Sequence, residues 1–292
     1  MVLPERYDIL HTVHRRKPVV EHSGKGREQV NTMDVIKGRR SVRTFDGRAL
    51  TDEDRAALIE YSRSIRNPYD IPVEFIFLDA ASHGLSSPVI AGEKLYVAGK
   101  AAKVPHAEEA FGFSFEKLVL YAWSLGIGTT WIGGTMNRAQ FEKAAGLKTG
   151  EMMPCVSPLG YPAKKMSVRE TLMRKGVKAG ERKNAEELFF DGDIVTPLKA
   201  ADEKVRDALE MVRLAPSAVN RQPWRVVRIG SSYHFYLKHA KGYVSEATGD
   251  LQKVDMGIAL CHFMSGADGK LLLDDPGLST EKDTEYIATV LV

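Results

Sequence analysis

The sequence predicts a mixed α+β fold that contains an internal duplication. Segments with apolar residues at helical spacing alternate with short runs rich in Val, Ile and Phe, which are typical of strands. The order helix, turn, proline, strand and glycine-containing helix occurs once in each half of the chain. A chain of 292 residues usually forms one large domain or two small ones, so a duplication of this size fits its length.

The first repeat is expected to begin after an N-terminal extension, residues 1–32, because Met33 opens a segment that is typical of the start of a fold. Thr51 and the three acids that follow it predict the start of a helix. Val73–Leu78 is rich in Val, Phe and Ile, which predicts a strand. Phe111–Leu125 carries the strongest helical pattern of the chain and is followed by helix-breaking glycines.

The middle of the chain contains shorter signals. Met152–Leu159 is interpreted as a short buried strand or loop. Residues 164–187 are rich in Lys, Arg and Glu, which indicates a crossing segment or linker. Thr196-Pro197 is typical of a helix start and predicts a helix that ends near Ala215.

The second repeat continues with a strand at Trp224–Ile229, a partner strand at Tyr233–Leu237, and an apolar helix over Asp255–Phe263. A constant offset of 151 residues relates Arg55 to Arg206, Leu58 to Leu209, Pro72 to Pro223 and Phe75-Ile76 to Val226-Val227. Gly112 on the first long helix matches Gly257 at an offset of 145. The single matches are weak, but the conserved order of elements favours a duplication that lets one chain build both halves of a symmetric dimer.

Composition excludes several classes of function. A net charge of +3 is too small to indicate a nucleic-acid surface, and no apolar run approaches the ~20 residues of a membrane span. Cys155 and Cys261 show no metal-ligand pattern, so we expect two reduced, buried thiols. The first 32 residues contain no stretch typical of a secretory signal. We therefore expect a cytoplasmic protein with no nucleic-acid or membrane partner.

Four segments carry residues suited to a phosphate-bearing, planar ligand. Guanidinium groups in Arg39-Arg40-Ser41-Val42-Arg43 can bind phosphate oxygens through paired donors, although such clusters are often solvated surface. Glycines in Gly128–Gly134 let the backbone approach a ring closely, although the loop could be an ordinary helix-to-strand turn. Glu181-Arg182-Lys183 adds cations, unless it is a charged linker. Ala215–Trp224 adds hydroxyl and amide groups, unless it only ends a helix.

These segments resemble the cofactor-binding motifs of the FMN-dependent nitroreductase family over most of residues 33–265. The match begins with Arg39-Arg40-Ser41-Val42-Arg43 followed by Thr44-Phe45, and continues with Gly128–Gly134 and Ala215–Trp224. The resemblance implies that the phosphate and ribityl end of FMN contacts Arg39, Arg40, Ser41, Arg43 and Arg182. It implies that the backbone of Ile132, Gly133 and Gly134 lies at flavin N5. It implies that the edge of the flavin ring contacts Pro216, Ser217, Asn220 and Gln222.

The two halves divide these motifs unequally, which resembles a fused, single-chain branch of the family. Residues 33–190 would form a nitroreductase-like half with the phosphate end of the site, and residues 191–292 a second half that supplies the ring-contacting turn. Where that turn should stand, the first half has Ile65–Pro72. The second half lacks both the arginine segment and a full glycine-rich loop. We therefore expect one flavin site per chain, a monomer, and an antiparallel sheet flanked by helices and formed jointly by both halves.

The resemblance implies a flavin-dependent oxidoreductase. NAD(P)H would deliver hydride to FMN, leave, and be replaced by a small-molecule electron acceptor such as a nitroaromatic or a quinone, in a ping-pong mechanism. The sequence assigns no catalytic side chain, and the spacing of His234, His239 and His262 does not suggest a metal site. Two alternatives stay open, namely another flavin chemistry such as dehalogenation or flavin destruction, and a flavin- or ligand-binding regulator without turnover.

Overall fold

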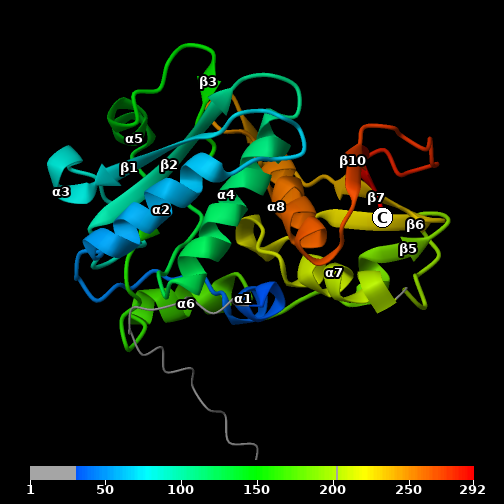
Figure 1. Cartoon of the computed structure of the whole chain (residues 1–292), viewed down its shortest axis with the longest axis horizontal. Coiled ribbons are helices and arrows are strands. Elements are labelled where there is room, and N and C mark those ends of the chain that lie inside the picture. Colours follow the sequence, from blue (N-terminus) through cyan, green and yellow to red (C-terminus); the bar gives the residue numbers. More distant parts are fainter. Residues whose placement is uncertain (1–30, 202) are drawn as a thin grey trace, which may run out of the picture.

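The computed structural model describes residues 31–201 and 203–292, so nearly all of the predicted extension, residues 1–32, lies outside the described residues. Two packed helices occupy the middle of the molecule, and a sheet lies on either side of them (Figure 1). Within the described ranges, no helix combines the length and the apolar character needed to cross a membrane.

The first half contains the first sheet and six helices of the described chain. Its elements, in order, are α1 (Thr32–Gly38), α2 (Asp52–Ser64), β1 (Glu74–Asp79), α3 (Ala80–His83), β2 (Leu95–Ala102), α4 (Ala107–Ser124), α5 (Arg138–Ala144), β3 (Glu151–Met152), β4 (Val156–Leu159) and α6 (Val168–Gly176). Thr51 caps α2 by accepting a hydrogen bond from the N–H of Asp54, as its sequence predicts.

The second half is described from the end of α6, which is before the predicted boundary at residue 190. Most of its strands form the second sheet, whereas two short strands at residues 244–245 and 249–250 form a separate two-stranded sheet. Its elements are η1 (Ala185–Glu187), β5 (Phe189–Asp191), α7 (Glu203–Leu214), η2 (Ala218–Asn220), β6 (Trp224–Ile229), β7 (Ser232–Lys238), β8 (Val244–Ser245), β9 (Gly249–Asp250), α8 (Leu251–Gly266), β10 (Lys270–Leu272) and β11 (Thr284–Leu291). The predicted strand Trp224–Ile229 is confirmed as β6, and its predicted partner is confirmed as β7, antiparallel to it.

The predicted single sheet, built jointly by both halves, is wrong. In the first sheet β2 pairs antiparallel with β1, β3 and β4, all from the first half. The second sheet has the order β10-β11-β7-β6-β5, and only its β5–β6 pair is parallel. The mixed α+β class is confirmed. The central helices lie between the two sheets, so the sheets pack against the helices and do not pair with each other.

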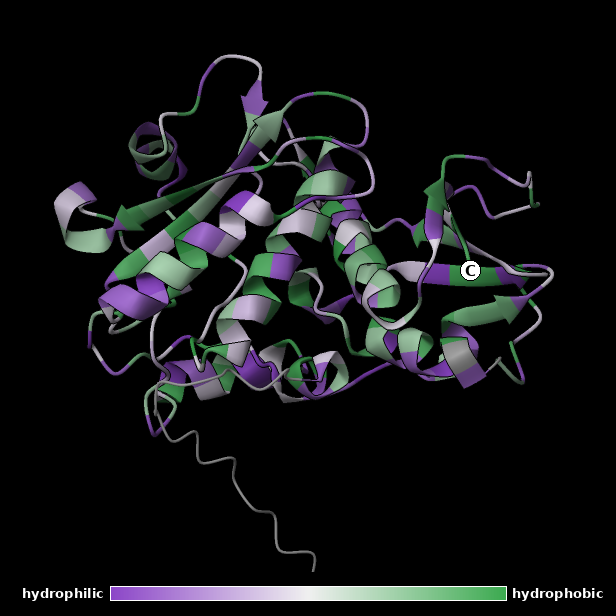
Figure 2. Cartoon of the chain, viewed as in Figure 1, coloured by the Kyte–Doolittle hydropathy of each residue, from purple (hydrophilic) through white to green (hydrophobic). Residues whose placement is uncertain are grey.

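The two central helices, α4 and α8, approach each other at two glycines. A Cβ atom on Gly112 would overlap the backbone carbonyl of Val254 on α8. A Cβ atom on Gly257 would likewise overlap the carbonyl of Glu109 on α4. Both helices are buried along most of their length, and the largest core cluster includes side chains from both halves, such as Phe115 and Phe263. In Figure 2 the strands of both sheets are largely hydrophobic, whereas α2 alternates between polar and apolar residues.

Two predictions about the connecting region need correction. The expected helix start at Thr196-Pro197 is wrong, because this segment is extended and Phe190 forms a bridge with Pro197. Asp193 accepts hydrogen bonds from the N–H and hydroxyl groups of Thr196, so these groups cap a turn and not a helix. The charged segment 164–187 is not only a linker, since it contains α6, whose N-terminus is capped by Ser167.

Candidate functional site

The arginine segment and the glycine-rich loop lie side by side. The N–H of Val42 donates to the carbonyl of Thr129 over 2.8 Å, and Ser41 and Thr129 form a parallel bridge. A Cβ atom on Gly128 would lie 2.8 Å from the Val42 side chain, so glycine is needed for this close approach. The structure therefore brings together two motifs that are about 90 residues apart in the sequence.

Four arginines gather beside this contact, and we call Arg39, Arg43, Arg174 and Arg182 the basic cluster. Burial is the main cause that lowers the pKa of Arg39, Arg43 and Arg182. The charge of Arg174 lowers the pKa of all three as well, which shows that the cations lie close to one another. Arg174 belongs to no sequence motif, and only the packing of α6 brings it here.

Two nitrogen atoms of the basic cluster are buried without a hydrogen-bond partner. These are Nη1 of Arg39 and Nε of Arg182. A buried donor without a partner costs about 1–3 kcal/mol, and more when it is charged, so such donors indicate a missing acceptor. A cavity of about 430 Å³ opens at Arg174, and it is also lined by Met166, Thr171, Lys175, Lys178, Ala179, Gly180 and Glu181. The arrangement suits an anion with several oxygen atoms.

Arg40 contacts a buried carboxylate, Glu170, whose charge also acts on Arg43 of the basic cluster. Its Nη1 atom lies 3.3 Å from Oε1 of Glu170 on α6. The hydroxyl of Thr44 donates to the other oxygen of Glu170 over 2.8 Å. These contacts fix α6 against the arginine segment. The sequence does not indicate Glu170, because one acid in a charged segment is expected to be exposed.

The turn Ala215–Trp224 contacts the basic cluster from the second half. Oδ1 of Asn220 accepts a hydrogen bond from Nη1 of Arg182 over 3.2 Å, and its Nδ2 donates to the carbonyls of Lys178 and Glu181. Oε1 of Gln222 accepts from the N–H of Lys183 over 2.8 Å. The predicted ring contacts of Asn220 and Gln222 therefore stay predictions, since in this structure both amides hold the segment that carries Arg182.

This turn is strained. Val219, Asn220 and Gln222 all have positive φ angles, of 43°, 59° and 51°. A positive φ is unfavourable for a β-branched residue such as Val, and strain of this kind persists only where the surroundings impose it. The N–H of Gln222 donates to Oγ of Ser217 over 2.8 Å, which closes the turn. Pro216 and Ser217 are half-buried at its start.

The other side of the turn contacts the start of α8. The N–H of Ala218 donates to both carboxyl oxygens of Asp255, over 3.0 and 3.1 Å. Burial raises the pKa of Asp255 well above its usual value. Leu251 lies one helical turn before Asp255, at the glycine-rich loop. A Cβ atom added to Gly133 would lie 3.2 Å from the Leu251 side chain and 3.4 Å from Sγ of Cys155. The start of α8 therefore contacts the turn through Asp255 and the glycine-rich loop through Leu251.

The loop residues predicted to line the flavin differ in how much of their backbone is free. Ile132 is buried, and its N–H and carbonyl both pair with Val156 over 2.9 Å. The carbonyl of Gly133 accepts a hydrogen bond from Arg138 over 2.8 Å. Nothing lies within 4 Å of a Cβ position on Gly134, so this residue faces open space. Gly134 is therefore the member of this group that a ligand could approach.

A buried polar network, which the sequence does not indicate, lies behind Arg39. Oε1 of Glu116 on α4 is 3.0 Å from Nε2 of His262 on α8 and 4.0 Å from Nε of Arg39. Oε2 of Glu116 accepts a hydrogen bond from the indole of Trp131 over 3.1 Å. The side chains of Glu116 and His262 are both completely buried. Both cysteines are buried free thiols, as predicted, and burial raises the pKa of Cys155 to about 12.

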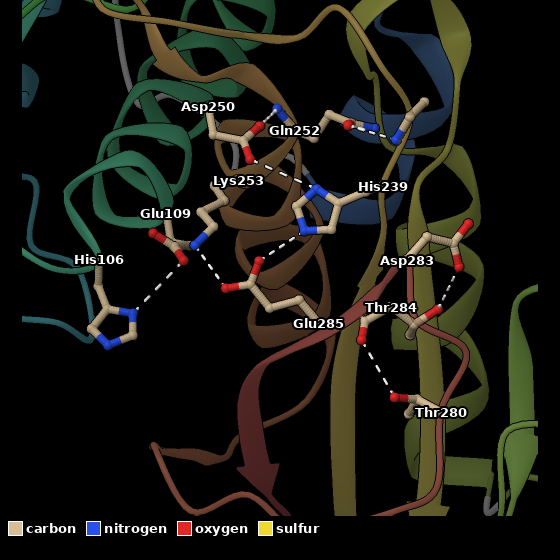
Figure 3. A network of polar contacts seen from close by, with 11 residues as sticks. His106, Glu109, His239, Asp250, Gln252, Lys253, Thr280, Asp283, Thr284 and Glu285 are labelled. Atoms are coloured by element: carbon tan, nitrogen blue, oxygen red, sulfur yellow. Dashed lines mark hydrogen bonds and ion pairs between the residues drawn. The ribbon is translucent and has the colours of Figure 1, made fainter.

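A second polar network lines a cavity of about 460 Å³ where both central helices begin (Figure 3). Glu285 of β11 contacts Nζ of Lys253 and Nε2 of His239, each over 2.8 Å. Glu109 on α4 is buried, and its Oε2 atom has no hydrogen-bond partner. Burial raises the pKa of Glu109 to about 7. Among residues 31–201 and 203–292, no group of three or more His, Cys, Asp or Glu side chains could hold a metal ion.

Comparison with known proteins identifies a family and a fold. A model of the family described as "Putative TM nitroreductase" matches residues 31–267. The chain is similar to a structure described as a "putative nitroreductase" from Thermotoga maritima, with a TM-score of 0.58 and 19% sequence identity. That match covers 94% of this chain and 99% of the other. At this level of identity the likeness shows the fold alone.

Two further structures match about half of the chain. An FMN-dependent nitroreductase from Clostridium difficile R20291 matches with a TM-score of 0.39 and 17% identity, over 48% of this chain and 94% of its own. A "putative NADH oxidase" from Clostridium acetobutylicum matches with a TM-score of 0.38 and 22% identity, over 46% of this chain and 90% of its own. Both TM-scores are too low to bear on this chain. No curated protein matches the sequence.

Proposed function

Because the chain belongs to the nitroreductase family described as "Putative TM nitroreductase", we propose that it is an FMN-dependent oxidoreductase. It would use NAD(P)H to reduce nitroaromatic or quinone-like acceptors. The observation that carries the proposal is the basic cluster, in which buried cationic donors without partners lie next to the turn that the sequence singled out.

The residues of the site fit the phosphate end of FMN. Nη1 of Arg39 and Nε of Arg182 would donate to phosphate oxygens, and Arg43 and Arg174 would add positive charge. A phosphate dianion would also relieve the mutual repulsion that helps to lower the pKa values of these arginines. The hydroxyls of Thr129 and Thr130 are buried without partners, so they could pair with the ribityl hydroxyls.

The other end of the site would hold the flavin ring. When bound, FMN supplies the hydride chemistry, and the protein supplies binding, orientation and exclusion of water. The loop at Gly134 and the start of the turn at Ser217 would position the ring, with the backbone of Gly133 beside it. Asp255, held by the N–H of Ala218, could store a proton near this end because burial favours its neutral form. No sequence motif indicates this acid.

We further propose that the chain is a pseudo-dimer. The offset of 145 residues that relates Gly112 to Gly257 also relates Glu109 to Val254. Gly112 contacts Val254, and Gly257 contacts Glu109, which is the reciprocal pattern that a two-fold axis requires. The order α2, β1, β2, α4 is also repeated as α7, β6, β7, α8. The predicted boundary near residue 190 would fall within β5, which crosses to the second sheet.

The same offsets explain why one flavin site is expected and not two. The offset of 151 relates Tyr69 to Asn220, and the offset of 145 relates His106 to Leu251. Tyr69 and His106 therefore stand at the position that corresponds, by the proposed two-fold symmetry, to the flavin site. There the rings of Tyr69 and His106 stack with their centroids 5.5 Å apart. Aromatic rings then stand where the first site has the turn and Leu251, and the cavity of about 460 Å³ beside them is lined by acids such as Glu109 and Glu285 and not by an arginine cluster. With the usual dimer interface inside one chain, a monomer in the cytoplasm remains our expectation.

The test is flavin-dependent turnover by the purified protein. We expect oxidation of NADH or NADPH that requires both added FMN and a nitroaromatic or quinone acceptor, with the parallel-line kinetics of a ping-pong mechanism. Asn220→Ala should raise the FMN concentration needed for half-maximal activity by about tenfold, because Arg182 loses its anchor. Asp79→Ala, which removes the side-chain cap of α3 outside the proposed site, is the control. Bound FMN without NAD(P)H oxidation would contradict the proposal and favour a regulator.

A further inference from the structure

The contact between Glu116 and His262 contains a proton whose position can be inferred from hydrogen-bond geometry. Nδ1 of His262 lies 2.8 Å from the carbonyl oxygen of Met211. A carbonyl only accepts hydrogen bonds, so Nδ1 must carry a hydrogen. Nε2 of the same ring lies 3.0 Å from Oε1 of Glu116. Two bare lone pairs would repel at this distance, so one more proton lies between the ring and the carboxylate.

The pair is therefore neutral as a unit, whichever partner holds the proton. If His262 holds it, an imidazolium faces a carboxylate, and if Glu116 holds it, both groups are uncharged. The indole of Trp131 donates to the remaining oxygen of Glu116 and does not change this balance. Both side chains are completely buried, where an unpaired charge would be costly.

This neutrality matters for Arg39, the next group in the network. Nε of Arg39 lies 4.0 Å from Oε1 of Glu116, too far for a hydrogen bond but close enough for a strong electrostatic interaction in the interior. An unprotonated Glu116 with no charge on His262 would cancel the charge of Arg39. We propose that His262 neutralises Glu116 and so keeps the positive charge of Arg39 available to the phosphate of the cofactor. The proposal rests on the proposed FMN site, and it makes His262 a positioning residue that acts from α8 on a site in the first half.

The experiment compares the dissociation constants of FMN and riboflavin, which lacks the phosphate, by quenching of flavin fluorescence. Four proteins are compared, namely the wild type, His262→Gln, Glu116→Gln and the double variant. In Glu116→Gln the new amide can accept from Trp131 and donate to Nε2 of His262, so the hydrogen bonds and the neutral state persist.

We expect His262→Gln to weaken FMN binding by about tenfold or more, because Glu116 then becomes an anion beside Arg39. Riboflavin binding should change by less than about threefold in the same variant. Glu116→Gln and the double variant should keep the preference of the wild type for FMN over riboflavin. A gain in FMN affinity in Glu116→Gln, or an equal loss of both flavins in His262→Gln, would overturn the proposal.

A second measurement uses only the wild-type protein, in case a variant fails to fold. The ¹⁵N resonances of the His262 ring should show a protonated Nδ1, either in an imidazolium or in the neutral Nδ1–H form. The neutral Nε2–H form would overturn the proposal, because it leaves Glu116 charged. Failure of the wild type to bind either flavin would instead contradict the proposed function, while the NMR result would stand on its own.

Discussion

At the scale of single residues, some positions in the candidate site could be predicted from the sequence, whereas others depend on the fold. The guanidinium pattern at Arg39 and Arg43 indicates a phosphate, and the structure places both in the basic cluster. Arg174 joins them only because α6 folds back over the arginine segment, and no motif could indicate this. Asn220 has the chemistry of a ring contact, yet its amide holds the segment around Arg182. That difference depends on how two distant turns meet.

Buried acids are the residues that are most difficult to predict from the sequence. Glu116, Glu109 and Asp255 lie on helices that are mostly apolar, and an acid in such a pattern is most simply interpreted as an exposed position. In the structure all three are buried. Their surroundings come from the opposite central helix or from the turn after α7, so helical spacing gives no indication of them.

Glu109 offers a prediction about stability and pH. Its folded-state pKa of about 7 lies above the reference value of 4.5, so the folded state favours the protonated form. Its contribution to stability is present below pH 4.5 and is lost as the pH rises through about 7. Glu109→Gln removes this loss. At pH 8 we expect the variant to be more stable than the wild type by on the order of 2 kcal/mol, with the difference shrinking toward pH 5.

Urea denaturation at several pH values measures this difference. Glu60→Gln, at an exposed position on α2, is the matched control and should leave the free energy of unfolding unchanged within about 0.5 kcal/mol. A Glu109→Gln variant that is less stable than the wild type at pH 8 would show that the carboxylate is held as a paired charge by Lys253.

At the scale of elements, the sequence succeeds where a pattern is strong and local. The residues of β6 are predicted one for one, because a β-branched run follows a proline. The helices α4 and α8 are both predicted but begin several residues earlier than expected. The strand β2 is not predicted, because only its start, with Tyr96 and Val97, favours a strand, whereas the Ala and Gly residues that follow do not. It is a strand because neighbours pair with it on both sides.

The contact between α4 and α8 gives a prediction at this scale. Gly257→Ala would place a methyl group on the carbonyl of Glu109 and within 2.8 Å of the N atom of Phe113. Backbone atoms cannot move aside as a side chain can, so we expect a loss of about 3 kcal/mol in the free energy of unfolding.

Gly176→Ala is the matched control, because this helical glycine on α6 has nothing within 4 Å of its Cβ position. It should change stability by no more than about 1 kcal/mol. Denaturant unfolding of both variants measures the effect. Equal stabilities would mean that α4 and α8 are not packed as closely as the structure shows.

At the scale of the whole molecule, the two halves have unequal roles in the proposed site. Each half contributes one of the two larger sheets and one central helix, and the helices meet at Gly112 and Gly257. The sequence shows that the motifs are split between the halves, and the repeat that it predicts stays a prediction. It does not predict the two separate sheets, since strand pairing over long distances leaves no local signal. The basic cluster and the strained turn come from different halves, so the proposed site exists only when both halves are packed together.

The most direct test of this account is the number of flavins bound per chain. Isothermal titration of the purified protein with FMN should give one flavin per chain. Arg182→Gln should weaken FMN binding much more than riboflavin binding, because Nε of Arg182 is the buried donor that would pair with the phosphate. Two equal sites per chain would contradict the single site, and binding of riboflavin as tightly as FMN would contradict the role of the basic cluster. No binding of FMN at all would contradict the central claim.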